Sequence, residues 1–349
     1  MPRQSPRQVT LRFTAHDDVD HVDDPLHRDL SAAMRIGGAL FLTCDETSGI
    51  DRLVETDRGW GDHVHFSLGE MIDLPGGRSG EMDAEGLSGD EDWLWVCGSQ
   101  SLKRGKPGKD DGRKAAMAAM ARIESDDNRQ FIGRVPLVSR DGLPTPVARD
   151  GKRRAQHLAF RKGGQLRRWL RDDPHIGPFL DLPSKENGLD VEGIAAQGLR
   201  VWLGLRGPVL RAHAVVIELE LEATAKGRLK ATKIDGDRKY RLHLLPTDGS
   251  GIRDLALDGD DILVVTGPVT TADGPSHLLR WRDAVKTVKP GLRDDDVEHV
   301  LELPYRGQVD HPEGLTRWHG NDWLVVYDSP RPARVKDDPP SVKADIWTL

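Results

Sequence analysis

The sequence predicts an all-β fold, a β-propeller built as a single domain over residues 1–349. Three observations predict it. A strand–turn–strand segment recurs along the chain, the second strand of each copy is almost continuously apolar, and both ends of the chain read as strands. Such recurrence is typical of a repeat architecture, in which no single unit can bury its apolar face alone.

Each copy opens on a short motif of an acidic residue, a glycine and an aliphatic residue. The three clear copies are Glu85-Gly86-Leu87, Glu192-Gly193-Ile194 and Glu313-Gly314-Leu315. A fourth copy has Arg253-Asp254-Leu255 in this place, and a fifth, weaker copy has Ser31-Ala32-Ala33. Arg253 is therefore the odd member of an otherwise acidic position.

A turn rich in Gly, Asp or Asn and a second, apolar strand follow each motif. The second strands are expected at 39–44, 93–98, 201–205, 262–267 and 323–328. Two strands joined by such a turn indicate a β-hairpin. Continuous apolar runs imply burial on both faces, and further strands within each copy bring the content to about four, as in a propeller blade.

The spacing of the motifs predicts five blades, with six as the alternative. From Ser31 to Glu313 the successive spacings are 54, 107, 61 and 60 residues. The long gap holds either a degenerate sixth blade or a basic, partly helical insertion at 105–182. Residues 114–121 and 153–169 favour helix, apart from Gly163-Gly164.

The two ends of the chain are expected to pair and close the ring. Val9–Phe13 and Ala344–Leu349 are both strand-like, and pairing them leaves no exposed edge. No apolar run approaches the roughly 20 residues that span a bilayer, and no signal-peptide core is present. Since the chain has two cysteines and no zinc-type spacing, we expect a cytoplasmic protein without membrane contact.

The charge is unevenly distributed. The net charge is -7, yet residues 101–171 carry 19 Lys or Arg against 7 Asp or Glu. This excess indicates either a surface for a protein or another acidic partner, or a solvated insertion without a partner. Nucleic acid is the less favoured partner because no aromatic ladder or nucleic-acid motif accompanies the charge.

Several segments resemble the bacterial DUF3616 family, which is named only for its domain of unknown function. They are Glu81–Leu87, Gly98–Arg104, Lys185–Gly193, Gly204–Pro208 and Gly251–Leu255. The resemblance spans roughly residues 30 to 330 and implies a propeller without an established reaction. This chain has Gln100 where the family usually has histidine. More distantly, the Glu-Gly blade starts resemble SMP-30/gluconolactonase and phytase-like propellers, in which acidic residues at the channel mouth hold a divalent cation.

Repeated positions in a propeller converge on one rim, so Glu85, Glu192 and Glu313 should form an acidic ring that Arg253 interrupts. Close carboxylates repel one another unless their pKa values rise, an arginine pairs with them, or a hard cation such as Ca²⁺ or Mg²⁺ binds. The competing interpretation makes each glutamate a staple to the neighbouring blade. Asp45, Glu46 and Asp328 end second strands, and we expect them on the opposite rim or near a loop.

A set of basic residues is the candidate site for an anion. Forked guanidinium donors suit anions such as phosphate, although pairing with the abundant carboxylates is the alternative. The set comprises Lys103, Arg104, Lys185, Arg206, Arg211 and Arg253.

Two functions remain open, and the sequence does not decide whether the protein is an enzyme. The first is a non-catalytic propeller that presents its rim and basic insertion to a protein or other acidic partner. The second is a divalent-cation-dependent hydrolase, of lactonase or phosphoesterase type, at the channel mouth. The first is favoured because the sequence shows no nucleophile–base arrangement.

Overall fold

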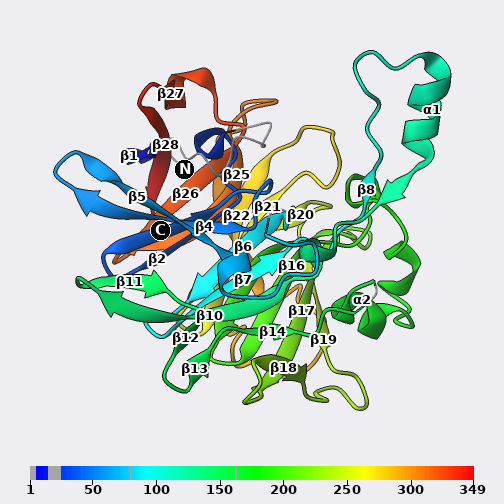
Figure 1. Cartoon of the computed structure of the whole chain (residues 1–349). Coiled ribbons are helices and arrows are strands. Elements are labelled where there is room, and N and C mark those ends of the chain that lie inside the picture. The colour runs from blue at the N-terminus through cyan, green and yellow to red at the C-terminus, as the bar shows by residue number, and fades with distance from the viewer. Residues whose placement is uncertain (1–4, 15–24, 79, 162) are drawn as a thin grey trace.

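The computed structural model describes residues 5–14, 25–78, 80–161 and 163–349. The fold is all-β, as predicted: antiparallel sheets are arranged around a centre, and the short helices lie outside them (Figure 1). None of the helices in these ranges is long and apolar enough to cross a membrane.

Most strands fall into five antiparallel units, each of which runs from a strand at the centre to one at the outside. Unit 1 contains β2 (Ala32–Ile36), β3 (Ala39–Thr43), β4 (Gly49–Thr56) and β5 (Gly59–Ser67). Unit 2 contains β6 (Ala84–Gly89), β7 (Trp93–Gly98), β10 (Ile132–Arg140) and β14 (Gln156–Leu158). Unit 3 contains β15 (Asp190–Gln197), β16 (Arg200–Gly207), β17 (His213–Ala223) and β19 (Arg241–Pro246). Unit 4 contains β20 (Gly251–Asp258), β21 (Asp261–Gly267), β22 (Ser276–Trp281) and β24 (Val297–Leu303). Unit 5 contains β25 (His311–His319), β26 (Asp322–Asp328), β28 (Pro340–Thr348) and, from the other end of the chain, β1 (Arg7–Arg12).

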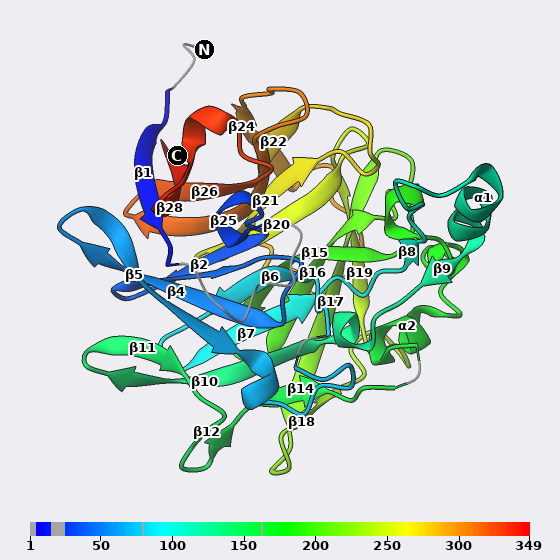
Figure 2. The same cartoon turned by 45° about the horizontal axis from the view of Figure 1, so that its top comes forward.

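The two ends of the chain pair, as the sequence predicted. β1 runs antiparallel to β28, with Val9 opposite Ala344 and Leu11 opposite Val342. Figure 2 shows β1 beside β28 at the edge of the molecule. Leu11 and Phe13 are buried, so the N-terminal strand contributes apolar core as well as hydrogen bonds.

The glycine of the repeated motif lies where the central strands of neighbouring units approach most closely. A Cβ added to Gly86 would lie 3.0 Å from the backbone nitrogen of Ile194, and one added to Gly193 would lie 2.8 Å from that of Leu255. One added to Gly314 would lie 2.7 Å from the backbone nitrogen of Ala33. The motif therefore recurs because only glycine lets these backbones approach.

Unit 4 has aspartate at this position and uses it differently. The Asp254 carboxylate accepts hydrogen bonds from the backbone nitrogens of Leu255 and Leu315, both at 2.7 Å. The second of these bonds crosses to unit 5. The central strands contact one another in the order β2, β6, β15, β20, β25 and back to β2.

The range 105–182 contains strands and short helices. β10 pairs with β7 and β14 pairs with β10, so both belong to the sheet of unit 2. The helices are α1 (Arg113–Ala121) and α2 (Gln165–Leu170). The helix expected over 153–169 is confirmed only from Gln165 onward, where α2 lies. Its first part instead contains the strands β13 (Arg153–Arg154) and β14. β13 pairs with β12 (Arg149–Asp150), and β10 also pairs with β11 (Leu143–Pro146).

Outside the sheets, α1 stands on a two-stranded stalk and projects from the body of the molecule (Figure 1). The stalk consists of β8 (Lys103–Arg104) and β9 (Ile123–Glu124), which pair antiparallel. We call residues 103–124 the arm. Three short strands remain. β18 (Arg228–Ala231) pairs with both β14 and β17. β23 (Gly291–Leu292) pairs with β19, and β27 (Val335–Asp337) pairs with β28.

Candidate functional site

The first residues of the five motifs line one cavity at the centre of the ring. The cavity has a volume of about 770 Å³, and Ser31, Glu85, Glu192, Arg253 and Glu313 all lie on its wall. We call it the mouth cavity. Its charged lining comprises ten carboxylates (Asp29, Asp45, Glu46, Glu81, Asp83, Glu85, Glu186, Glu192, Glu313, Asp328) and seven cations (Lys103, Arg104, Lys106, Arg129, Lys185, Arg206, Arg253).

The ends of the second strands lie on this same cavity. Asp45, Glu46 and Asp328 were expected on the opposite rim or near a loop, and the expectation of an opposite rim is wrong. The reason is that the second strand of a hairpin runs back antiparallel to the first. Its last residue therefore lies beside the first residue of the motif strand.

Arg253 joins two of the three motif glutamates. Its Nη1 lies 2.7 Å from Glu192 Oε2, and its Nη2 contacts Glu313. Glu192 and Glu313 are 1% and 3% exposed. Because Arg253 belongs to unit 4 and the two glutamates to units 3 and 5, the guanidinium bridges three units. The arginine that interrupts the acidic ring thus compensates its charge.

Arg206 provides a second bridge on the other side of Glu192. Its Nη1 lies 2.5 Å from Glu192 Oε1, and its Nη2 lies 2.5 Å from Asp190 Oδ2. Burial by itself lowers the pKa of Arg206, but the carboxylates of Asp190 and then Glu192 outweigh burial and raise it above its ordinary value. Each oxygen of Glu192 is thus within ion-pair distance of an arginine.

A residue that the sequence analysis did not single out, Arg129, plays the corresponding part in unit 2. Its Nη1 lies 2.6 Å from Asp83 Oδ2, and its Nη2 contacts Glu81, which Lys103 also contacts. Arg129 is buried and lies in a short 3-10 helix, Asp127–Gln130, rather than in a motif strand. No repeat or spacing in the sequence marks it.

Glu85 differs from the other motif glutamates. Within the described ranges it makes no ion pair or side-chain hydrogen bond, and its side chain faces the cavity. Burial raises its pKa well above the usual range, and the neighbouring carboxylates of Asp83 and Glu192 raise it further. Glu85, which is half-buried, is therefore the motif glutamate whose charged form is least favoured.

Asp29 and Asp45 form a second acidic group, and neither has an ion pair with a basic residue in the part of the chain that the structure describes. Their carboxyls are hydrogen-bonded to each other. Burial, and then the contact with Asp45, raises the pKa of Asp29 to about 11, while burial raises that of Asp45 to about 6. The pair consequently shares one proton at neutral pH.

The predicted basic set divides into paired and unpaired members. Arg104 forms a bidentate pair with Glu186, with Nε at 2.7 Å and Nη2 at 2.6 Å from its oxygens. Lys185 lines the cavity and has no ion pair among the described residues. Arg211 is exposed in the turn after β16 and does not belong to the lining of this cavity, as far as the chain is described.

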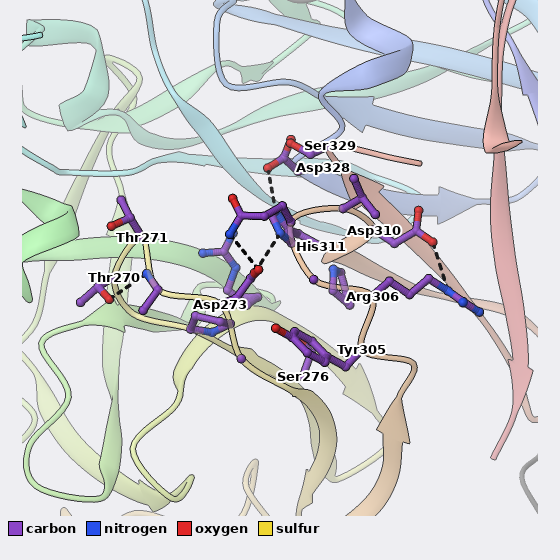
Figure 3. A pocket seen from close by; sticks show the side chains of 18 of the residues that line it. Thr270, Thr271, Asp273, Ser276, Tyr305, Arg306, Asp310, His311, Asp328 and Ser329 are labelled. Atoms are coloured by element: carbon purple, nitrogen blue, oxygen red, sulfur yellow. Dashed lines mark hydrogen bonds and ion pairs between the residues drawn. The ribbon is translucent and has the colours of Figure 1, made fainter. Parts of the chain in front are cut away.

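A smaller pocket of about 260 Å³ opens from the mouth cavity and shares four lining residues with it: Lys185, Arg206, Arg253 and Asp328. His311 lies between two carboxylates there, with Nδ1 3.6 Å from Asp328 Oδ2 and Nε2 3.7 Å from Asp273 Oδ1. Figure 3 shows His311 between these aspartates, with Tyr305 on the opposite wall. Tyr305 is 55% exposed.

The geometry bears on the metal hypothesis as well. Among the described residues, no group of three or more His, Cys, Asp or Glu side chains is placed to hold a metal ion. Arginines contact both carboxylate oxygens of Glu192 and Oε1 of Glu313, and a cation would compete with them for these oxygens. Of the compensations considered for the acidic ring, the structure shows arginine pairing at Glu192 and Glu313 and a raised pKa at Glu85.

The fold and the site define a repeat-built β-protein with an ion-paired central cavity, which is the class of the β-propellers. The chain belongs to the DUF3616 family, described as a protein family of unknown function, whose model matches residues 29–345. The resemblance seen in the sequence is thus confirmed.

Solved structures match the chain at low similarity. Glutaminyl cyclase from Myxococcus xanthus is 9% identical with a TM-score of 0.39, over 99% of this chain and 100% of that one. An oxidoreductase (glucose dehydrogenase) from Thermus thermophilus is 13% identical with a TM-score of 0.39, over 92% and 97%. An exo-1,5-α-L-arabinanase from a bovine ruminal metagenomic library is 10% identical with a TM-score of 0.39, over 91% and 92%. Likenesses of this size carry no information about activity, and no curated protein matches the chain.

Proposed function

We infer that the five units are the five blades of one closed propeller and that the arm is an insertion between the second and third strands of blade 2. The ring of contacts between central strands supports five blades. The residues between Glu85 and Glu192 supply β7, β10 and β14 to blade 2, which accounts for the long spacing without a sixth blade.

We propose that the protein is a non-catalytic binding protein, and that its arm and the adjoining rim of the mouth cavity capture an acidic segment of another protein. The observation that carries this proposal is the apolar surface of the arm. Met117, Met120 and Ile123 are 66%, 52% and 46% exposed. Exposed methionines on a short helix are typical of a protein-binding surface, because they adapt their shape to a partner.

The charge around these residues favours an acidic partner. Lys106, Lys109, Arg113, Lys114 and Arg122 all belong to the arm. The only acidic residues of the arm are Asp110, Asp111 and Glu124, and Arg122 pairs with Glu124 at 3.0 Å. Lys185 extends the positive charge to the rim. Two free, buried cysteines, Cys44 and Cys97, agree with a reducing cytoplasm as the location.

Site-specific photo-crosslinking in cells tests this proposal. Met117 or Met120 is replaced by p-benzoylphenylalanine, and the matched control carries the same group at Val288, which is 59% exposed outside the arm. We expect one protein with an acidic segment to be crosslinked from both arm positions and not from Val288. Replacing residues 106–121 by a short Gly-Ser linker leaves the β8–β9 stalk and β10 in place, and should abolish capture. Equal crosslinking from all three positions would refute the proposal.

A second candidate function, hydrolysis of a lactone or phosphoester in the mouth cavity, is favoured by one observation. The pKa of Glu85 and those of the Asp29–Asp45 pair are raised beside the mouth cavity, and carboxyl groups with raised pKa values are suited to general acid catalysis. A divalent cation is the cofactor that this candidate would need. Titration of the wild type and Glu192→Gln with Ca²⁺ and Mg²⁺, followed by thermal unfolding, tests it. Stabilisation of the wild type alone supports the hydrolase, and no stabilisation by either ion removes the metal.

A further inference from the structure

A separate pocket lies at the outer edge of the ring, between blades 2 and 3. It has a volume of about 250 Å³ and shares no described lining residue with the mouth cavity. The β12–β13 hairpin, β14 and the turn before β18 surround it. Its polar lining comprises Asp73, Arg149, Arg154, His157, Lys226 and Arg228.

The charge of this pocket is one-sided, unlike that of the mouth cavity. Four cations line it, Arg149, Arg154, Lys226 and Arg228, and Asp73 is the one carboxylate among its described lining residues. In the described part of the chain, Arg154 and Lys226 form no ion pair. The positive charge of this pocket is therefore available to a ligand, whereas most arginines of the mouth are held by carboxylates.

A buried histidine fixes one of the arginines. His157 is 8% exposed, and its Nδ1 donates a hydrogen bond to the Leu158 carbonyl oxygen at 2.7 Å. Arg228 Nη1 lies beside the ring, 3.0 Å from Nε2 and 3.2 Å from Nδ1, and only the unprotonated Nε2 can accept a hydrogen bond from it. Burial, and to a smaller extent the charge of Arg228, lower the pKa of His157 to about 4 against the raising effects of the Leu158 carbonyl and Asp73. The imidazole is thus neutral and orients Arg228 without adding charge.

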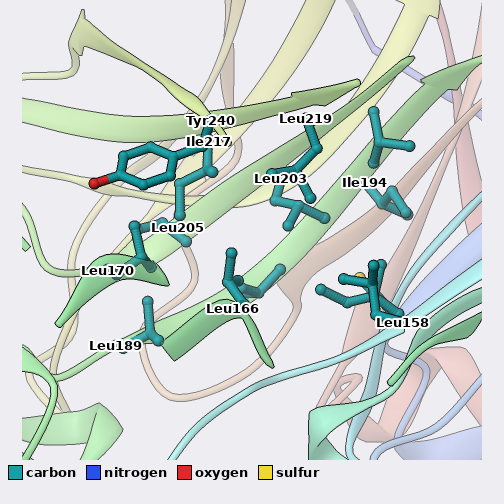
Figure 4. Packing of buried hydrophobic residues seen from close by; sticks show 14 of the residues in the cluster. Leu158, Leu166, Leu170, Leu189, Ile194, Leu203, Leu205, Ile217, Leu219 and Tyr240 are labelled. Carbon is teal, nitrogen blue, oxygen red and sulfur yellow. The ribbon is translucent and has the colours of Figure 1, made fainter. Parts of the chain in front are cut away.

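The surroundings make the pocket rigid. Leu158, next to His157, belongs to the buried hydrophobic cluster between blades 2 and 3 shown in Figure 4. The turn before β18 approaches the strand beside it closely, because a Cβ added to Gly227 would lie 2.8 Å from the Ala155 carbonyl oxygen and 3.2 Å from Arg154 Cδ. Gly227 has φ of 77°, a conformation that glycine adopts without strain.

We propose that this pocket binds the phosphate group of a small phosphorylated molecule. Guanidinium groups match phosphate oxygens in a forked geometry, and several cations around one small cavity suit a dianion. The volume is just below the roughly 300 Å³ at which pockets for whole drug-sized ligands begin, which fits a phosphate group better than a complete nucleotide. The site is independent of the function proposed for the arm and the mouth.

Calorimetric titration with inorganic phosphate and with pyrophosphate, at constant ionic strength set with sodium chloride, tests the site. The variants are Arg228→Gln and Lys226→Ala. The matched control is Lys152→Ala, an exposed lysine at the tip of the β12–β13 hairpin that is not among the residues lining the pocket. We expect at least a tenfold loss of pyrophosphate affinity in Arg228→Gln, a smaller loss in Lys226→Ala, and no change in Lys152→Ala.

Urea unfolding of each variant without ligand separates lost binding from lost folding, and Lys226→Ala, at an exposed turn, should unfold like the wild type. Three results overturn the proposal: no measurable binding of either anion to the wild type, equal affinity in all the variants, or equal loss in Lys152→Ala. Tight binding of a 30-base-pair DNA duplex that pyrophosphate does not displace also overturns it, in favour of a nucleic-acid backbone.

Discussion

Arg253 is the residue whose removal should disturb the ring most directly. Replacement by methionine keeps most of the volume of the side-chain stem and removes the guanidinium. Glu192 then retains Arg206 as its partner at 2.5 Å. Glu313, with a side chain that is 4% exposed, loses its only ion-pair partner among the described residues. Arg253→Met therefore leaves one buried carboxylate without compensation.

The size of the effect follows from this difference. Breaking a buried ion pair by removing one partner costs about 3–5 kcal/mol, because the remaining charge stays buried without a partner. We expect a loss of about 3 kcal/mol in the free energy of unfolding for Arg253→Met. Adding Glu313→Gln removes the stranded charge, and the double variant should recover at least about 1 kcal/mol, within the range of coupling between contacting residues.

Urea unfolding at pH 7 followed by tryptophan fluorescence measures both quantities. Arg211→Met serves as the matched control, since Arg211 is an exposed arginine without an ion pair in the described structure, and its loss should stay within about 0.5 kcal/mol. The reasoning is wrong if Arg253→Met costs less than about 1 kcal/mol, or if Glu313→Gln lowers the stability of Arg253→Met further.

Three more predictions concern the ring. Gly193→Ala should destabilise the protein by about 1–3 kcal/mol, because the new Cβ would lie 2.8 Å from the Leu255 nitrogen. A loss of less than about 0.5 kcal/mol in the free energy of unfolding, measured in urea, would contradict the close approach of the two central strands. Glu85→Gln should stabilise the protein at pH 8, because the variant removes a carboxylate whose charged form the cavity disfavours. Because the folded-state pKa of Glu85 is raised, the wild type loses stability as the pH rises above about 4, the ordinary pKa of glutamate. The stability advantage of Glu85→Gln should therefore vanish near pH 4. An advantage that does not change with pH would contradict the raised pKa. Deletion through Phe13 removes β1 and the buried side chains of Leu11 and Phe13, and it exposes the edge of β28. The burial of these two side chains contributes about 3–6 kcal/mol to the free energy of unfolding. An unchanged thermal midpoint would show that β1 does not close the ring.

The repeated motif carried most of what could be predicted from the sequence. The positions of Glu85, Glu192 and Glu313 identified the central strands β6, β15 and β25, and Arg253 was recognised as the exception. Local information suffices here, since turn residues, apolar strands and a repeat all lie within short segments. The same holds for the pairing of the two ends, because a closed ring requires a partner for each edge strand.

The chemistry of the centre could not be predicted from the same residues. The motif suggested three equivalent glutamates, but burial and neighbours make them different: Glu192 has two arginine partners, Glu313 has one, and Glu85 has none in the described chain. The partner Arg206 lies in the second strand of its own unit, and Arg129 lies in a short 3-10 helix outside any repeat. Ion pairing depends on distances of a few ångströms between segments far apart in sequence, which no spacing reveals.

The sequence by itself thus determined that the chain builds an all-β ring from repeated hairpins with one irregular, basic stretch. The reason is that strand propensity, turn chemistry and repetition are local properties. Only the tertiary structure decided that the motif glycine is the point of closest approach between units, and that Asp45 and Asp328 lie at the same mouth as the glutamates. It also decided that the free positive charge gathers around Arg154 and Arg228, because that depends on which carboxylates remain close enough to neutralise each arginine.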